Sequence, residues 1–232
     1  MKKKFLCIGL CAFIAGSGFG QTNFIRGEEL FMRNKPAEAL VFLENAIAED
    51  PAHVQAFLYL GIAYEQLGRN DEAVAVYRRI LGRAGDLAPA VATNLGNVYF
   101  RTGNFEYAEQ FYSQALTGDS AYSSAYLGRA NTRIKTGALR DAVADYELYL
   151  ALELRSPKRP EIERMVAFIR SEFAAEERRR LLAEETARQE AERRQRLMDD
   201  LAASLQSAAG DSQGLSTGAE NVEAYDGEFE LE

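Results

Sequence analysis

The sequence predicts an all-α fold in which about four helix-turn-helix units follow one another, with further helix after them. Two observations lead to this prediction. The stretch LGIAYEQLGRNDEAVAVYRRIL, residues 60–81, returns 35 residues later as LGNVYFRTGNFEYAEQFYSQAL, residues 95–116, with seven identical positions. Alanines also recur at spacings of 34, 35 and 34 residues, at Ala39, Ala73, Ala108 and Ala142. Self-similarity with such a period is the signature of a repeat architecture.

Residues 1–20 are predicted to be a secretory signal peptide. Three lysines precede an apolar run from Phe5 to about Gly16, and Gly18 and Gly20 place small residues where a signal peptidase needs them. The alternative is a retained membrane anchor, because no charged residue follows until Arg26.

Both cysteines of the chain, Cys7 and Cys11, lie in this segment. Cleavage therefore leaves a mature chain without thiols, which excludes disulfides, zinc sites and thiol chemistry. Leucines precede both cysteines, where a lipidated cysteine needs a small residue, so lipidation is disfavoured.

Each repeated unit is predicted to be two short helices joined by a tight turn. Gly68, Gly103 and Gly137 occupy one offset, with Asn34 in their place in the first copy, and only a few residues separate them from the repeated alanines. The units are expected at about residues 20–53, 54–88, 89–122 and 123–154.

Small residues are expected to let the two helices of a unit approach closely. A glycine inside a helix costs about 1 kcal/mol relative to alanine, so a packing reason must offset it. The small residues are Gly27, Gly61, Gly96 and Ala130, and the residues expected to fill the space beside them are Leu43, Tyr77, Tyr112 and Tyr146.

This pattern resembles the tetratricopeptide repeat family, whose unit is a 34-residue helix-turn-helix. The resemblance covers about residues 20–154 and rests on Leu60, Gly61 and Tyr64 and their counterparts Leu95, Gly96 and Tyr99. The outer copies depart from it at Leu30, Arg129, Arg133 and Tyr149. The resemblance implies a right-handed solenoid whose concave groove, lined by the first helix of each unit, holds peptides or partner helices.

The family's groove-facing offsets supply the candidate binding residues. Asn97 and Asn131 are equivalent, and an amide carries both a donor and an acceptor for a peptide backbone. Arg101 and Lys135 are also equivalent and are expected to attract acidic groups. The predicted site adds Phe100, Ile134, Glu65 and Gln66. A solvated helix surface is the alternative interpretation of the Asn pair.

Residues 155–207 are predicted to form a capping helix and then a charged helix. Ile162, Val166, Ile169 and Phe173 give one apolar stripe suited to covering the end of the solenoid. Beyond them the stripe is lost and Glu–Arg pairs stand four residues apart, which indicates a solvated helix rather than a coiled coil. Leu197, Leu201 and Leu205 form a second short stripe that could dock on something. Residues 208–232 are predicted to be a disordered acidic tail.

The composition argues against catalysis and against nucleic-acid binding. The formal net charge is −8, whereas nucleic-acid binding depends on excess Lys and Arg. The single histidine, His53, lies in an inter-repeat turn, so no Ser/His/Asp set is available elsewhere, and no cofactor or metal site is expected. The prediction is therefore an exported interaction scaffold that binds a protein or peptide. The alternative is a membrane-tethered accessory subunit of an envelope assembly or transport complex.

Overall fold

The computed structural model describes the backbone of residues 17–218 and the side chains of residues 22–209. The chain divides into two compact units, residues 1–169 and residues 170–232, which are considered separately. Residues 1–16 of the predicted signal peptide and residues 219–232 of the predicted tail lie outside the described residues. Helix α1 begins at Ser17, three residues before the expected start of the repeats at about residue 20.

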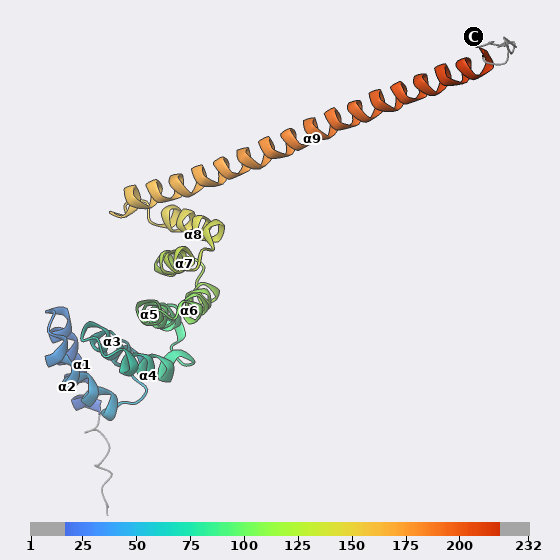
Figure 1. The fold of residues 1–232 in the computed structure, drawn as a ribbon. Helices are drawn as coiled ribbons and strands as arrows, with labels where there is room; N and C mark the ends of the chain where they lie inside the picture. Colours follow the sequence, from blue (N-terminus) through green and yellow to red (C-terminus); the bar gives the residue numbers. More distant parts are fainter. Residues whose placement is uncertain (1–16, 219–232) are drawn as a thin grey trace, which may run out of the picture. The chain divides into compact units, whose positions relative to one another are not determined.

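Four helix pairs build the first unit, and within the described residues there are helices and turns but no strands. The two helices of each pair pack against each other, and successive pairs pack together (Figure 1). The pairs are α1 (Ser17–Met32) with α2 (Pro36–Glu49), α3 (Val54–Gln66) with α4 (Asn70–Leu81), α5 (Ala88–Arg101) with α6 (Phe105–Gly118), and α7 (Ser123–Thr136) with α8 (Leu139–Leu152). The predicted all-α solenoid is confirmed. The spacing from Ala73 to Ala108 is one residue longer than the other two, and a 3-10 turn, Gly85–Leu87, lies between the second and third pairs.

The turn inside each pair uses a left-handed backbone conformation, as the repeated glycine predicts. The φ angles are 72° at Gly68, 79° at Gly103 and 82° at Gly137. Asn34 takes the same role in the first pair with a φ of 57°. Glycine and asparagine tolerate this region better than other residues, which explains why these two types share the offset.

The small residues inside the first helices meet large side chains of the second helices, as expected. A Cβ atom added to Gly61 would lie 2.3 Å from Cε1 of Tyr77, and one added to Gly96 would lie 2.7 Å from Cε1 of Tyr112. Gly128 was not singled out by the repeat pattern, yet its Cβ would lie 2.3 Å from the same Tyr112 ring. The Tyr112 ring is therefore held between two glycines of successive units.

The two arginines that depart from the family pattern belong to a buried ion network. Arg129 and Arg133 of α7 both bind the carboxylate of Asp145 in α8, which is 1% exposed. Arg133 also pairs with Glu109 of α6 at 2.7 Å, and Arg129 donates to the hydroxyl of Ser113 at 3.0 Å. The network thus joins the second helix of the third pair to both helices of the fourth.

Helix α9 (Arg159–Gly218) follows the repeats. In the first unit its residues Ile162, Val166 and Ile169 are buried, in agreement with the predicted apolar stripe. Arg159 donates to the carbonyl oxygens of Leu150, Glu153 and Leu154 and so satisfies groups at the end of α8.

In the second unit, α9 continues through residues 208–218, where the sequence predicts the tail to begin. Two alanines follow residue 207, and alanine is the strongest helix former. Ion pairs lie along this unit. Glu192 with Arg196, at 4.0 Å, is one of the pairs that the sequence predicts, whereas Arg180 pairs with Glu184 at 3.6 Å in the reverse order, with the base first.

Candidate functional site

A pocket of about 480 Å³ opens between α5 and α7. Four of the predicted site residues line it: Asn97, Phe100 and Arg101 from α5, and Asn131 from α7. The pocket is also lined by Thr93, Leu127, Tyr112 and Gly128. The repeat period places equivalent residues of successive first helices side by side, which is why these residues meet.

Both asparagine amides are held in place by tyrosines of their own units. The hydroxyl of Tyr112 donates to Oδ1 of Asn97 at 2.8 Å, and the hydroxyl of Tyr146 donates to Oδ1 of Asn131 at 2.7 Å. One lone pair of each amide oxygen is therefore used inside the protein, and the Nδ2 group remains as the donor. Compared with the sequence-based expectation, in which each amide offers both a donor and an acceptor, the acceptor is already partly occupied.

Arg101 is engaged with residues of the preceding unit. Its Nη2 atom lies 3.1 Å from Oε2 of Glu65 and 2.9 Å from Oδ1 of Asn70. Glu65 in turn accepts a hydrogen bond of 2.5 Å from the hydroxyl of Tyr77. Burial raises the pKa of the Glu65 carboxyl, and the hydrogen bond from Tyr77 and the charge of Arg101 oppose that rise. The positive charge of Arg101 is therefore partly balanced before any ligand arrives.

The other predicted residues lie outside the pocket lining. Gln66 and Lys135 are exposed near the ends of α3 and α7, and Ile134 is half-buried. Glu65 joins the pocket only through Arg101. The structure therefore brings together half of the eight predicted residues and leaves the rest on the neighbouring surface.

Two features of the pocket were not predicted. Lys158, from the turn before α9, lines the pocket and is exposed. It lies after the repeats, where the repeat period gives no register, so only its positive charge could have drawn attention to it. The hydroxyl of Thr93 is buried and has no hydrogen-bond partner in the described part of the chain. The sequence predicts that residue 93 lies in the first helix of the third unit. Whether the Thr93 hydroxyl finds a hydrogen-bond partner depends on the side chains packed around it, which the sequence does not give.

Outside this pocket, the described residues show no further candidate for a catalytic or metal-binding site. His53 is the N-cap of α3: its Nδ1 atom accepts from the backbone N–H of Ala56 at 3.2 Å, and its ring lies 4.3 Å from that of Phe24. Within the same residues, no group of His, Cys, Asp and Glu side chains is arranged to hold a metal ion. No described helix combines the length and apolar character needed to cross a bilayer.

Comparison with family models assigns the repeats. Residues 30–97 match one tetratricopeptide repeat model, and residues 90–118 match another. Together the two matches span residues 30–118, which is less than half of the chain. The third pair thus falls wholly within the tetratricopeptide matches, whereas the fourth pair and α9 follow them.

Similar proteins share these repeats. The chain is 30% identical over 145 residues to Protein FlbA of Caulobacter vibrioides, covering 62% of this chain and 24% of that protein. It is 32% identical over 110 residues to RNA polymerase II-associated protein 3 of Mus musculus, covering 47% of this chain and 16% of that protein. The chain thus spans a quarter or less of the length of these two relatives.

Solved structures share the tetratricopeptide fold. PilF of Pseudomonas aeruginosa aligns with a TM-score of 0.60 at 18% identity, over 68% of this chain and 72% of that one. MamA from residue 41 onward, of Desulfovibrio magneticus RS-1, aligns with a TM-score of 0.56 at 17% identity, over 71% of this chain and 98% of that one. Stacked repeats of this kind form extended concave surfaces, which proteins with such folds use to bind other proteins.

Proposed function

We propose that this chain is an exported scaffold that binds a segment of a partner protein in the pocket between α5 and α7. The observation that carries the proposal is that Asn97, Phe100, Arg101 and Asn131 all line one pocket. A volume of about 480 Å³ falls within the range of pockets that hold small ligands or a few peptide residues.

The pocket offers mainly hydrogen-bond donors. The amide nitrogens of Asn97 and Asn131 are oriented by the tyrosine contacts, and Arg101 and Lys158 have no acceptor groups in their side chains. A fitting segment therefore presents acceptors, namely backbone carbonyl oxygens or carboxylates. Phe100 and Leu127 supply apolar contact for its side chains.

A moderate preference for acidic segments follows from the balance of charges. Glu65 offsets much of the charge of Arg101. Lys158 on the pocket and Lys135 on the adjoining surface are exposed. These lysines supply most of the attraction for a carboxylate, and because they are exposed this attraction weakens with salt.

Replacing both asparagines by aspartate tests the donor role. Aspartate keeps an acceptor for the hydroxyls of Tyr112 and Tyr146 but removes the amide donors, so the fold is retained. Short peptides selected from a random displayed library on the wild-type protein serve as the probe. Their binding to Asn97→Asp with Asn131→Asp should weaken by about 2 to 3 kcal/mol if each amide donates one buried hydrogen bond.

A matched control separates the loss of donors from added charge. Gln66→Glu with Thr136→Glu adds two carboxylates near the ends of α3 and α7 and leaves the pocket lining unchanged. This variant should bind the selected peptides nearly as well as the wild type. Equal binding by the aspartate variant, or a library that yields no binder, would remove the pocket as the site.

Export is proposed from the N-terminal sequence alone. Mass spectrometry of the chain from its native cell should find a mature N-terminus near Gln21. An intact or acylated N-terminus would instead favour a membrane-tethered accessory subunit of an envelope assembly or transport complex.

A further inference from the structure

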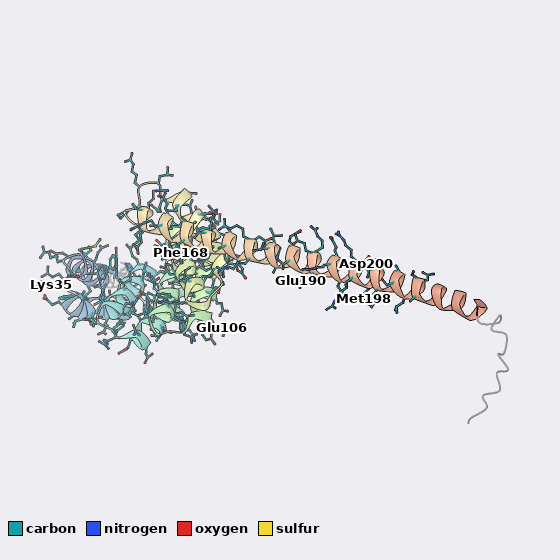
Figure 2. The ribbon with its side chains drawn as sticks, turned by 45° about the horizontal axis from the view of Figure 1, so that its top comes forward. Lys35, Glu106, Phe168, Glu190, Met198 and Asp200 are labelled. Atoms are coloured by element: carbon teal, nitrogen blue, oxygen red, sulfur yellow. The ribbon has the colours of Figure 1, made fainter. Side chains whose placement is uncertain are left out.

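In the second unit, α9 carries large apolar side chains in water. Leu197, Met198, Leu201 and Leu205 are 67%, 57%, 52% and 64% exposed. Met198, Leu201 and Leu205 are spaced three and four residues apart, so they share one face of the helix. Asp199 and Asp200 lie on other faces, because successive residues turn by about 100°. Figure 2 shows Asp200 on the other side of the helix from Met198.

A shallow hollow lies on the same face, toward the N-terminal side of the leucines. Its lining is Ala187, Glu190, Ala191, Arg194, Gln195 and Met198. Ala187, Ala191, Arg194, Met198, Leu201 and Leu205 continue one spacing of four, three, four, three and four residues. The six lining residues form two overlapping diamonds of four, which is the shape that receives a side chain from a facing helix in coiled-coil packing.

We propose that α9 pairs in an antiparallel manner with α9 of a second copy of this chain. Leu201 and Leu205 of each copy fill the alanine-floored hollow of the other. In this register Leu201 faces Ala191, Leu205 faces Ala187, and Met198 faces Arg194. Each of these three facing pairs joins a large residue of one copy to a small or flexible residue of the other. The face is therefore complementary to itself, as a two-fold interface requires.

The charge distribution selects the antiparallel direction. Residues 188–196 contain four arginines and two glutamates, whereas residues 197–209 contain Asp199 and Asp200 and no basic residue. The antiparallel register brings residues 188–196 of one copy alongside residues 197–209 of the other, so segments of opposite net charge run side by side. Asp199 and Asp200 lie on outer faces, so this attraction acts at longer range than a direct ion pair. A parallel pair would instead place Arg194 against Arg194 in the paired face, which is unfavourable.

This pairing is independent of the pocket between α5 and α7, so either proposal can fail without the other. It links two repeat domains in one assembly. A partner with two binding segments is then held by both copies, and the second binding event gains from the raised effective concentration.

Sedimentation of the full chain, with Cys7 and Cys11 replaced by serine, tests the pairing. We expect twice the monomer mass of 25.8 kDa. Leu201→Glu with Leu205→Glu should weaken the dimer by at least ~100-fold, because carboxylates would be buried without partners. Leu181→Glu with Leu182→Glu is the matched control: both leucines are exposed on α9 but lie off the paired face, so the dimer should persist.

Engineered cysteines test the direction. A mixture of Ala191→Cys chains and Leu201→Cys chains should form a disulfide between the two kinds of chain under mild oxidation. Ala191→Cys alone should not cross-link, because its two copies would be about 15 Å apart along the pair, too far for a disulfide. A monomer at all concentrations, a dimer unaffected by the glutamates, or cross-linking of Ala191→Cys with itself would each overturn the proposal.

Discussion

Replacing Asp145 with asparagine tests whether the ion network holds the fourth helix pair in place. The Asp145 carboxylate accepts three hydrogen bonds, at 2.9 and 2.7 Å from Arg129 and at 2.8 Å from Arg133. Asparagine has almost the same shape but no charge and only one acceptor oxygen. The substitution therefore leaves two guanidiniums beside a neutral group.

The structure sets the expected size of the effect. Removing one partner of a buried ion pair costs about 3 to 5 kcal/mol. The side chains of Arg129 and Arg133 retain 17% and 18% exposure, and Arg133 keeps its contact with Glu109. Water and Glu109 therefore compensate in part, and the loss should fall near the lower end, at about 3 kcal/mol.

Amide hydrogen exchange measures this loss where it occurs, because repeat arrays unfold locally. A loss of 3 kcal/mol lowers the protection of the most slowly exchanging amides in α8 by about 100-fold. Peptides from α1 and α2 should exchange as in the wild type. Asp141→Asn is the control, since Asp141 is an exposed carboxylate on the same helix. A less than fivefold change in α8 would refute the argument that the network stabilises this pair.

Four further substitutions test the packing and the electrostatics of the repeats. Gly96→Leu should destabilise the fold by about 1 to 3 kcal/mol, because its Cβ alone would lie 2.7 Å from Tyr112, and unchanged thermal unfolding would contradict this. Gly103→Ala, at a φ of 79°, should cost about 1 kcal/mol, whereas Gly82→Ala, at a helical φ of −71° with open space around it, should gain about 0.4 to 1 kcal/mol in urea unfolding. Glu65→Gln should gain stability relative to the wild type as pH rises. The folded wild type keeps its Glu65 proton to a higher pH than the unfolded chain, whose pKa is near 4.5, so its stability falls between these two pKa values. A constant difference between the two proteins across that range of urea titrations would contradict the raised pKa.

The repeat period explains why so much of the fold could be predicted. A fixed spacing ties Gly61 and Gly96 to Tyr77 and Tyr112, so one packing solution serves successive units. The contacts that were missed break this period. Gly128 touches Tyr112 of the preceding unit, and Asp145 is buried only because two arginines replace apolar residues around it. Single-residue departures of this kind have no second copy that would reveal their partners.

The sequence predicts where the candidate site lies better than it predicts which hydrogen bonds the site residues make. The equivalence of Asn97 and Asn131 follows from the period, and the pocket lining includes both. Their hydrogen bonds to Tyr112 and Tyr146 depend on side-chain directions that spacing does not give. Lys158 reaches the pocket from outside the repeats, so its contribution depends on the turn between α8 and α9.

The polar chemistry of the groove follows from the packing of the tyrosines. Tyr77, Tyr112 and Tyr146 are buried, and each hydroxyl is directed toward the first helix of its own unit, where it needs an acceptor. In the third and fourth units the acceptor is Asn97 or Asn131. In the second unit Ile62 occupies that position, and the Tyr77 hydroxyl binds Glu65 one turn further along instead. The first unit has Leu43, which makes no such demand. The same core contact therefore leaves an amide donor facing the groove in two units and a carboxylate in another, so the acceptor-binding part of the wall is confined to the third and fourth repeats.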